Sequence, residues 1–342
     1  MTLATHPAPG PGSPPREDPA LLEIRDLHVT FERRGRAPLH AVQGIDLSIQ
    51  ARERFALVGE SGCGKSTSIL AMMGLLPANA EVRGSIRVDG VEMLACEERE
   101  RRAHRWTDVA MVFQSAMNSL NPVQPLLAQI VEPMVAHAFL DRRAARARAR
   151  ELLGLVGIPE RRADSYPHEL SGGMRQRAAL AMALSCDPKV LIADEPTTAL
   201  DTMVQAQIFQ LLRRLTEELG IAVVLVTHDL PVVMDFCDRA AVMYAGAIAE
   251  CASVRELYAR PRHPYTRLLL AASPDIERPD QIHPIPGVPP QLDRPVVGCR
   301  FRERCDVAIE RCREQEPPLT LVGVAHEAAC WHNEPPSEGA AA

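Results

Sequence analysis

The sequence lacks several features that would place it in common functional classes. It contains no apolar run long enough to span a bilayer, and it does not start with a charged and then apolar signal segment. Its formal net charge is −6, which gives no support for a nucleic-acid-binding protein held by bulk positive charge. We therefore expect a cytoplasmic protein whose attachment to a membrane comes through a partner.

Lysine and aromatic residues are also scarce. Lys65 and Lys189 are the only lysines, and every other basic Lys or Arg position is arginine. A chain that favours arginine so heavily still uses lysine where a slim ammonium group is needed. Aromatic residues make up 4% of the chain, which we attribute to coding bias rather than to function. Nine cysteines are present, and a reducing cytoplasm makes structural disulfides an unlikely use for them.

The patterning of the 342 residues predicts two folded regions and two tails. Residues 1–19 are rich in proline and glycine and, like residues 336–342, are expected to be disordered. Residues 20–260 alternate short strands and helices, as expected for an α/β domain. Within them, residues 115–170 lack strand patterning and predict a helical subdomain. Closely spaced prolines then lead into a C-terminal extension over residues 261–335.

The most informative segment fits the pattern G-x-x-x-x-G-K-[ST] of a phosphate-binding P-loop and reads Gly59-Glu60-Ser61-Gly62-Cys63-Gly64-Lys65-Ser66-Thr67. An apolar run at 55–58 predicts a strand before it, and residues 68–75 predict a helix after it. Glycines in such a turn let the backbone come close to phosphates. Lys65 suits the β- and γ-phosphate oxygens and the hydroxyl of Ser66 suits Mg²⁺, so we expect a nucleoside triphosphate to bind here.

Two further motifs follow the P-loop. Ser171, Gly172 and Gly173 open an arginine-rich amphipathic segment and can form a second anion site at a helix N-terminus. About twenty residues later, an apolar run that predicts a buried strand ends in Asp194 and Glu195. Asp194 is expected to hold Mg²⁺ through water and Glu195 to act as the general base for an attacking water. An isolated Asp-Glu-Pro is also a common strand exit, but its place after the glycine motif favours the functional interpretation.

The order and spacing of these motifs over about residues 20–260 resemble the ATP-binding subunit of an ABC transporter. The resemblance implies a P-loop ATPase core with an antiparallel β edge region and a helical subdomain. It implies that Gln114, after the apolar run at 109–113, senses Mg²⁺ and nucleotide and links them to a transmembrane partner. His228, at the end of the run at 221–227, would contact the γ-phosphate, and Asp201 would couple two nucleotide sites.

The adenine ring needs an aromatic partner, because bases stack on aromatic faces. The family supplies one aromatic residue from an early strand turn, and Phe31 is the candidate here. A core phenylalanine on an edge strand is an almost equally good interpretation of Phe31.

The C-terminal part resembles a narrower branch of the family, the ATPases of peptide and nickel importers. The segments that carry this resemblance are 263–270 and 285–290. It implies an ATP-hydrolysing motor at the cytoplasmic face of the inner membrane that drives uptake of oligopeptides or dipeptides. Its partners would be two multi-span permeases, an identical or paralogous ATPase and, indirectly, an extracytoplasmic peptide-binding protein. The alternatives are a nickel importer ATPase and a non-transport ABC ATPase of DNA repair or translation.

Four cysteines of the extension, Cys299, Cys305, Cys312 and Cys330, are spaced C-x5-C-x6-C-x17-C. In a reducing cytoplasm, clustered thiols indicate a metal more than disulfides. Four thiolates suit either a [4Fe–4S] cluster or a tetrahedral Zn²⁺. Tails of this kind in the peptide-importer branch resemble iron–sulfur binders, which favours the cluster. Unliganded core cysteines are the third interpretation.

Overall fold

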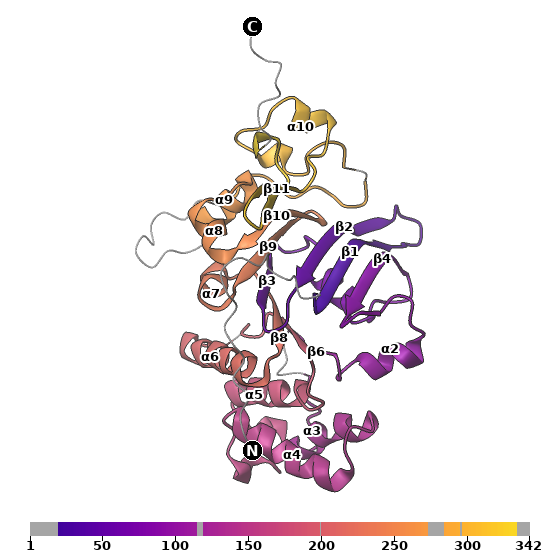
Figure 1. Cartoon of the computed structure of the whole chain (residues 1–342), viewed down its shortest axis with the longest axis vertical. Helices are drawn as coiled ribbons and strands as arrows, with labels where there is room; N and C mark the ends of the chain where they lie inside the picture. Colours follow the sequence, from indigo (N-terminus) through magenta and orange to yellow (C-terminus); the bar gives the residue numbers. More distant parts are fainter. Residues whose placement is uncertain (1–19, 115–118, 199, 273–283, 295, 334–342) are drawn as a thin grey trace, which may run out of the picture.

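The computed structural model describes residues 20–114, 119–198, 200–272, 284–294 and 296–333 (Figure 1). The expected tails at 1–19 and 336–342 lie outside the described residues. In chain order the strands are β1 Leu22–Phe31, β2 Leu39–Ile49, β3 Arg54–Val58, β4 Ala80–Val88, β5 Val91–Glu92, β6 Val109–Val112, β7 Val190–Asp194, β8 Ala222–Thr227, β9 Arg239–Tyr244, β10 Ala247–Ser253, β11 Thr320–Gly323 and β12 His326–Ala328. The helices are α1 Lys65–Met72, α2 Glu98–His104, α3 Leu126–Ala136, α4 Arg142–Leu155, α5 Gly172–Ala183, α6 Thr202–Leu219, α7 Leu230–Phe236, α8 Val254–Ala259, α9 Pro264–Ala271 and α10 Arg311–Glu314.

A central sheet of eight strands organises the molecule, in the order β11-β12-β10-β9-β3-β8-β7-β6. The five strands from β9 to β6 run parallel. Every residue of β7 and β8 is buried, because both faces of these strands are covered. Residues of α5 and α6 pack on one face, and α1 together with a second sheet packs on the other. Since parallel strands end at one edge, the segments after β3, β6, β7 and β8 meet there, and these segments carry the predicted site residues.

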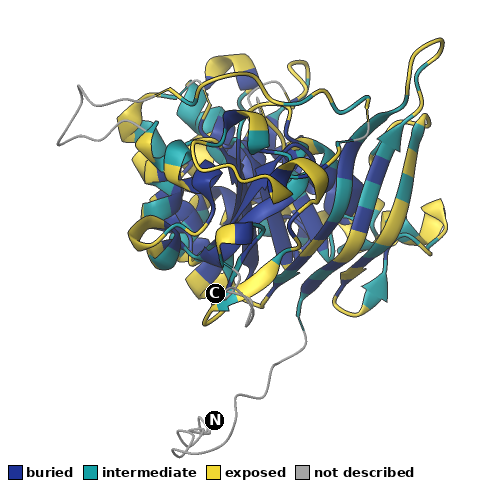
Figure 2. Ribbon diagram, turned by 90° about the horizontal axis from the view of Figure 1, so that it is seen from above, coloured by how far each residue is buried: buried dark blue, intermediate teal, exposed yellow. Residues whose placement is uncertain are grey.

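A second, antiparallel sheet has the order β2-β1-β4-β5. Its strands alternate buried and exposed residues, as expected when one face packs on a core and the other meets water (Figure 2). Leu22, Ile24 and Ile45 of this sheet share an apolar cluster with Phe55 and Val224 of the central sheet. The predicted α/β core with an antiparallel edge region is therefore confirmed.

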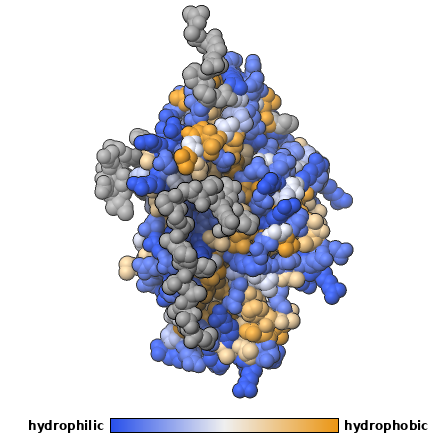
Figure 3. All heavy atoms as spheres, in the orientation of Figure 1, coloured by the Kyte–Doolittle hydropathy of each residue, from blue (hydrophilic) through white to orange (hydrophobic). Residues whose placement is uncertain are grey.

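The helical layer made by α3, α4 and α5 lies at the lower end of the molecule in Figure 1. The stretch predicted to be a helical subdomain contains α3 and α4 and no strand among its described residues. Asp141 caps α4 by accepting hydrogen bonds from the backbone N–H groups of Arg143 and Ala144. On the face drawn in Figure 3, hydrophobic side chains gather over this end, where Val135 and Phe139 are exposed. None of the described helices is long and apolar enough to cross a membrane.

The C-terminal extension continues the central sheet rather than forming a layer of its own. Strand β12 pairs antiparallel with β10, and β11 pairs with β12. A buried contact fixes this junction, because Nε2 of His326 lies 2.7 Å from Oε1 of Glu250. The same carboxylate accepts hydrogen bonds from the backbone N–H groups of Arg262 and His263. Strands β11 and β12, near the end of the extension, thus become part of the sheet that carries the P-loop.

Candidate nucleotide-binding and catalytic site

The P-loop joins β3 to α1 and wraps around the ammonium group of Lys65. Lys65 is buried, and its Nζ donates hydrogen bonds to the backbone oxygens of Gly59 and Glu60 at 2.7 and 2.9 Å. Gly64 precedes the helix with φ 111°, in the left-handed region. The loop therefore holds a cation at the N-terminal end of α1, where backbone N–H groups also favour anions.

Two glycines of the loop are required by the chain's own packing. A Cβ on Gly59 would lie 2.2 Å from the carbonyl oxygen of Met243, and one on Gly64 would lie 2.5 Å from that of Ala41. Gly62 differs, because a Cβ there would meet nothing within 4 Å although its φ is +79°. Among these three glycines, Gly62 is therefore the one whose Cβ position is open space.

Asp194 is a buried carboxylate at the carboxyl end of β7. Burial raises its pKa, the neighbouring Glu195 raises it further, and a hydrogen bond with Ser66 and the charge of Lys65 oppose the rise. An anion that is disfavoured by its surroundings and lies beside a hydroxyl is a suitable ligand for a hard divalent cation.

Glu195 lies at the centre of a hydrogen-bond network. Its Oε1 accepts from Nδ1 of His228 at 2.9 Å, and its Oε2 accepts from Nε2 of Gln114 at 2.7 Å and Oγ1 of Thr198 at 3.0 Å. Burial alone would raise its pKa, but these donors hold the pKa of Glu195 below the ordinary glutamate value. The backbone of Glu195 has φ 44°, which is uncommon outside glycine. The network keeps this carboxylate ionised and oriented.

One pocket brings most of the predicted residues together. Its lining includes Ser61, Gly62, Gly64, Lys65, Ser66, Thr67, Gln114, Asp194, Glu195, His228 and, at the far side, Phe31. Glu60 and Cys63 belong to the same loop, and Cys63 is buried. The lining also contains residues that the sequence analysis missed, namely Leu39, Ala41, Val226, Pro290 and Leu292. The placement of Phe31 fits the adenine hypothesis but does not test it.

The glycine motif and Asp201 lie outside this pocket. Ser171 caps α5 by accepting a hydrogen bond from the backbone N–H of Met174, and Asp201 caps α6 in the same way through Val204. A Cβ on Gly173 would lie 2.7 Å from Cγ1 of Val204, so the two helix N-termini pack against each other. None of Ser171, Gly172, Gly173 and Asp201 lines the pocket around Lys65. Within one chain the second anion site is separate from the first.

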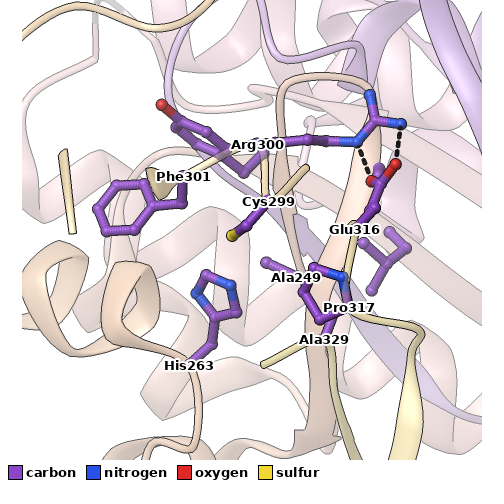
Figure 4. A pocket seen from close by; sticks show the side chains of 11 residues that line it. Ala249, His263, Cys299, Arg300, Phe301, Glu316, Pro317 and Ala329 are labelled. Atoms are coloured by element: carbon purple, nitrogen blue, oxygen red, sulfur yellow. Dashed lines mark hydrogen bonds and ion pairs between the residues drawn. The ribbon is translucent and has the colours of Figure 1, made fainter. Parts of the chain in front are cut away.

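The four cysteines of the extension lie in one small region. The backbone N–H of Cys299 donates to the carbonyl oxygen of Cys312 at 2.7 Å. Burial raises the pKa of the Cys299 thiol to about 11, and the nearby Cys312, Cys305 and Cys330 add to the rise. The Cys299 side chain lies near Phe301 and His263, beside the Arg300–Glu316 ion pair (Figure 4). Even so, no group of three or more His, Cys, Asp or Glu side chains among the described residues is arranged to hold a metal ion.

Comparisons with known proteins agree with this geometry. Residues 42–198 match the model of the ABC transporter family, and residues 249–312 match that of the oligopeptide/dipeptide transporter C-terminal region. A probable peptide ABC transporter ATP-binding protein of Sinorhizobium fredii is 47% identical over 327 residues, which cover 94% of this chain and 97% of that protein. The dipeptide transport ATP-binding protein DppD of Bacillus subtilis is 41% identical, with 94% and 97% covered.

A solved structure supports the same family. The chain is similar to the ATP-binding cassette MJ0796, described as a dimer in a post-hydrolysis state bound to ADP and Pi. The TM-score is 0.61 at 30% sequence identity, and the match covers 68% of this chain and 99% of that one.

Proposed function

Because this chain belongs to the ATP-binding subunits of ABC transporters, we propose that it is the ATP-hydrolysing motor of an importer of oligopeptides or dipeptides. The single observation that carries the hydrolytic part is the shared pocket of Lys65, Asp194 and Glu195. The peptide part is supported by the C-terminal family match and by relatives whose names specify peptide transport.

In the proposed reaction each side chain has a separate task. Lys65, already enclosed by backbone oxygens, binds the β- and γ-phosphates. Glu195 accepts the proton of the attacking water, and His228 both orients that carboxylate and faces the γ-phosphate. Ser66, Asp194 and Gln114 would hold Mg²⁺, since they offer oxygen ligands at one side of the pocket. Bound Mg²⁺ neutralises charge on the phosphate oxygens.

The second anion site is proposed to act in a partner chain. Ser171 caps α5 and Gly172 and Gly173 are its first residues, where backbone N–H groups have no partner within the helix. None of the three lines its own chain's pocket. Two chains facing each other would place this motif against the γ-phosphate held by the other P-loop, with Asp201 at the contact. The dimer described for the similar cassette supports this arrangement.

The helical layer is the proposed site for the membrane partners. A hollow beside α3 and α4 has apolar Leu127, Val131 and Val135 on one side and Arg142 and Arg146 on the other. Gln114 lines the nucleotide pocket and precedes α3, the first helix of this layer, in the sequence. Docking of two permeases here would place the protein peripherally at the cytoplasmic face of the inner membrane. The permeases, not this chain, would receive peptide from an extracytoplasmic binding protein.

The C-terminal cysteines remain a proposed [4Fe–4S] site, with Zn²⁺ as the alternative. Their spacing and the convergence of four thiols in one region support it, whereas the present arrangement of side chains does not form a coordination shell. Bound metal would require the thiols to lose their protons.

The decisive experiment is transport by the complex reconstituted in vesicles with its permeases and binding protein. Labelled oligopeptide or dipeptide should accumulate with ATP, and neither Lys65→Ala nor Glu195→Gln should support accumulation. Accumulation of Ni²⁺ instead of peptide would support the nickel alternative. ATP hydrolysis without any association with permeases would favour a non-transport ATPase.

A further inference from the structure

Arg304 of the C-terminal extension forms a two-pronged ion pair with the P-loop. Its Nη1 and Nη2 donate to Oε2 and Oε1 of Glu60 at 2.6 and 2.8 Å, although 244 positions separate the two residues. The side chain of Arg304 is 3% exposed and that of Glu60 is 26% exposed. Parallel hydrogen bonds of this kind fix the orientation of both groups as well as their distance.

A cluster of aromatic side chains holds this pair in place. The guanidinium of Arg304 lies 5.7 Å from the ring centre of Tyr244 and 5.8 Å from that of Phe301. Tyr265 is completely buried in the same cluster, and its hydroxyl accepts a hydrogen bond from the backbone N–H of Glu60 at 2.9 Å. Both the side chain and the backbone of Glu60 are therefore held by residues that lie beyond residue 240.

Arg304 also holds a second segment that reaches the nucleotide pocket. Its Nε donates to the carbonyl oxygen of Pro286 at 2.7 Å. A few residues further, Pro290 and Leu292 line the same pocket as the P-loop, and the carbonyl oxygen of Leu292 accepts from the backbone N–H of His40 at 2.9 Å. One side chain thus contacts both the phosphate-binding loop and the segment that forms part of the pocket wall.

We propose that Arg304 is a positioning residue for ATP binding, through which the C-terminal extension sets the charge and shape of the P-loop. The inference rests on the proposed function. Glu60 places a carboxylate beside a loop that must accept a triphosphate, and its own carbonyl oxygen contacts Lys65. Arg304 neutralises that carboxylate and keeps it turned away from the phosphates. Without Arg304, the carboxylate of Glu60 repels ATP.

Loss of the charge pair between Arg304 and Glu60 would differ from simple destabilisation, because a second substitution could restore ATP affinity. Arg304→Gln should weaken ATP binding by about tenfold, as expected when one close charge pair is lost. Adding Glu60→Gln removes the unpaired carboxylate, so the double variant should bind ATP more tightly than Arg304→Gln alone. If Arg304 only kept the extension folded, the second substitution could not restore affinity.

The test is isothermal titration of ATP into the full-length chain, with melting temperatures measured in parallel. Arg267→Gln is the matched control, because Nη2 of Arg267 in α9 donates to both carboxylate oxygens of Asp306 in the extension, and its ion pair within the described residues is with Asp306 rather than with the P-loop. It should bind ATP like the wild type. If Arg304→Gln does not fold, Arg304→Lys replaces it, because lysine keeps the positive charge but cannot form the paired hydrogen bonds of the guanidinium. The ATP affinity of Arg304→Lys should fall about threefold. The ATP affinity of Arg267→Lys, its control, should be unchanged.

Unchanged ATP affinity in Arg304→Gln, equal losses in Arg304→Gln and Arg267→Gln, or no recovery in the double variant would each overturn the inference. In the substitute experiment, equal affinity of Arg304→Lys and wild type would overturn it. Wild-type protein that bound no ATP would overturn the proposed function as well, so the two failures can be told apart.

Discussion

Nδ1 of His228 lies 2.9 Å from Oε1 of Glu195, and the two residues follow neighbouring strands of the central sheet. The contact orients the carboxylate proposed as general base and contributes to keeping its pKa below the ordinary glutamate value. Both side chains line the pocket that contains Lys65 and Asp194. The role of each side chain at the carboxyl ends of these strands can therefore be tested by a single substitution.

Glu195→Gln should bind ATP near the wild-type level and lose turnover. The amide keeps one acceptor oxygen, for either Gln114 or His228, but it cannot take the water proton. The rate should therefore fall by about 10²–10⁴-fold, the usual size of a general-base effect. The measurement is phosphate release by the assembled complex beside ATP titration of the isolated chain. Wild-type turnover in this variant would show that Glu195 is not the base.

Asp194→Asn should stabilise the ligand-free protein while abolishing the effect of Mg²⁺ on nucleotide binding. The folded state raises the pKa of Asp194, so ionisation of this group opposes folding at neutral pH, and the neutral amide avoids that cost. We expect a melting temperature higher by about 2 °C.

The difference in stability between Asp194→Asn and the wild type should depend on pH in one direction. Because the folded-state pKa lies above the unfolded value of 3.8, the advantage of asparagine is complete above the folded-state pKa. It should shrink as the pH falls through that value and disappear below the unfolded pKa. Thermal melts of both proteins from neutral to acidic pH check this. An advantage that grew on acidification would contradict the assigned direction.

Much of the site could be predicted because its signals are local. Each functional side chain follows a short apolar run, and the parallel arrangement of such strands brings their ends together without further information. Lys65, Asp194, Glu195 and His228 therefore share one pocket as the spacing required. The relevant patterns extend over fewer than ten residues each.

The contacts of the extension could not be predicted in this way. His326 pairs with Glu250 across 76 positions, and Arg304 with Glu60 across 244. Neither pair has a local pattern, because any arginine or histidine of the tail could in principle meet any acid. Pro290 and Leu292 line the nucleotide pocket from a proline-rich stretch whose pattern indicates the family branch and a connector, but not a contact with the nucleotide site. Tertiary packing, not periodicity, decides these positions.

If each site is completed by the Ser171 motif of another chain, as proposed, ATP should promote association of the Glu195→Gln variant. Ser171→Asp should prevent this association, because aspartate caps a helix as well as serine but adds a negative charge toward the γ-phosphate. Ser253→Asp makes the same change at the cap of α8 and should leave association intact. The measurement is the mass in solution with and without ATP.

The natural partner in that experiment can be a paralogous ATPase rather than a second copy. The masses are therefore measured with the isolated chain and again with the paralogue and permeases present. An unchanged mass on adding ATP under both conditions would contradict the sandwich, as would equal association of Ser171→Asp and Ser253→Asp.

The cysteines of the extension provide the last prediction. If Cys299, Cys305, Cys312 and Cys330 hold a [4Fe–4S] cluster, anaerobically purified protein should be brown and should bleach on oxidation. Cys305→Ser should abolish the colour. Cys96→Ser should keep it, because Cys96 lies outside this group and a serine can preserve its hydrogen bond to the carbonyl oxygen of Glu92. Elemental analysis then decides among the three interpretations. Iron supports the cluster, stoichiometric zinc supports the tetrahedral site, and metal-free anaerobic protein would mean that these are protonated core thiols, as the raised pKa of Cys299 favours when no metal is bound.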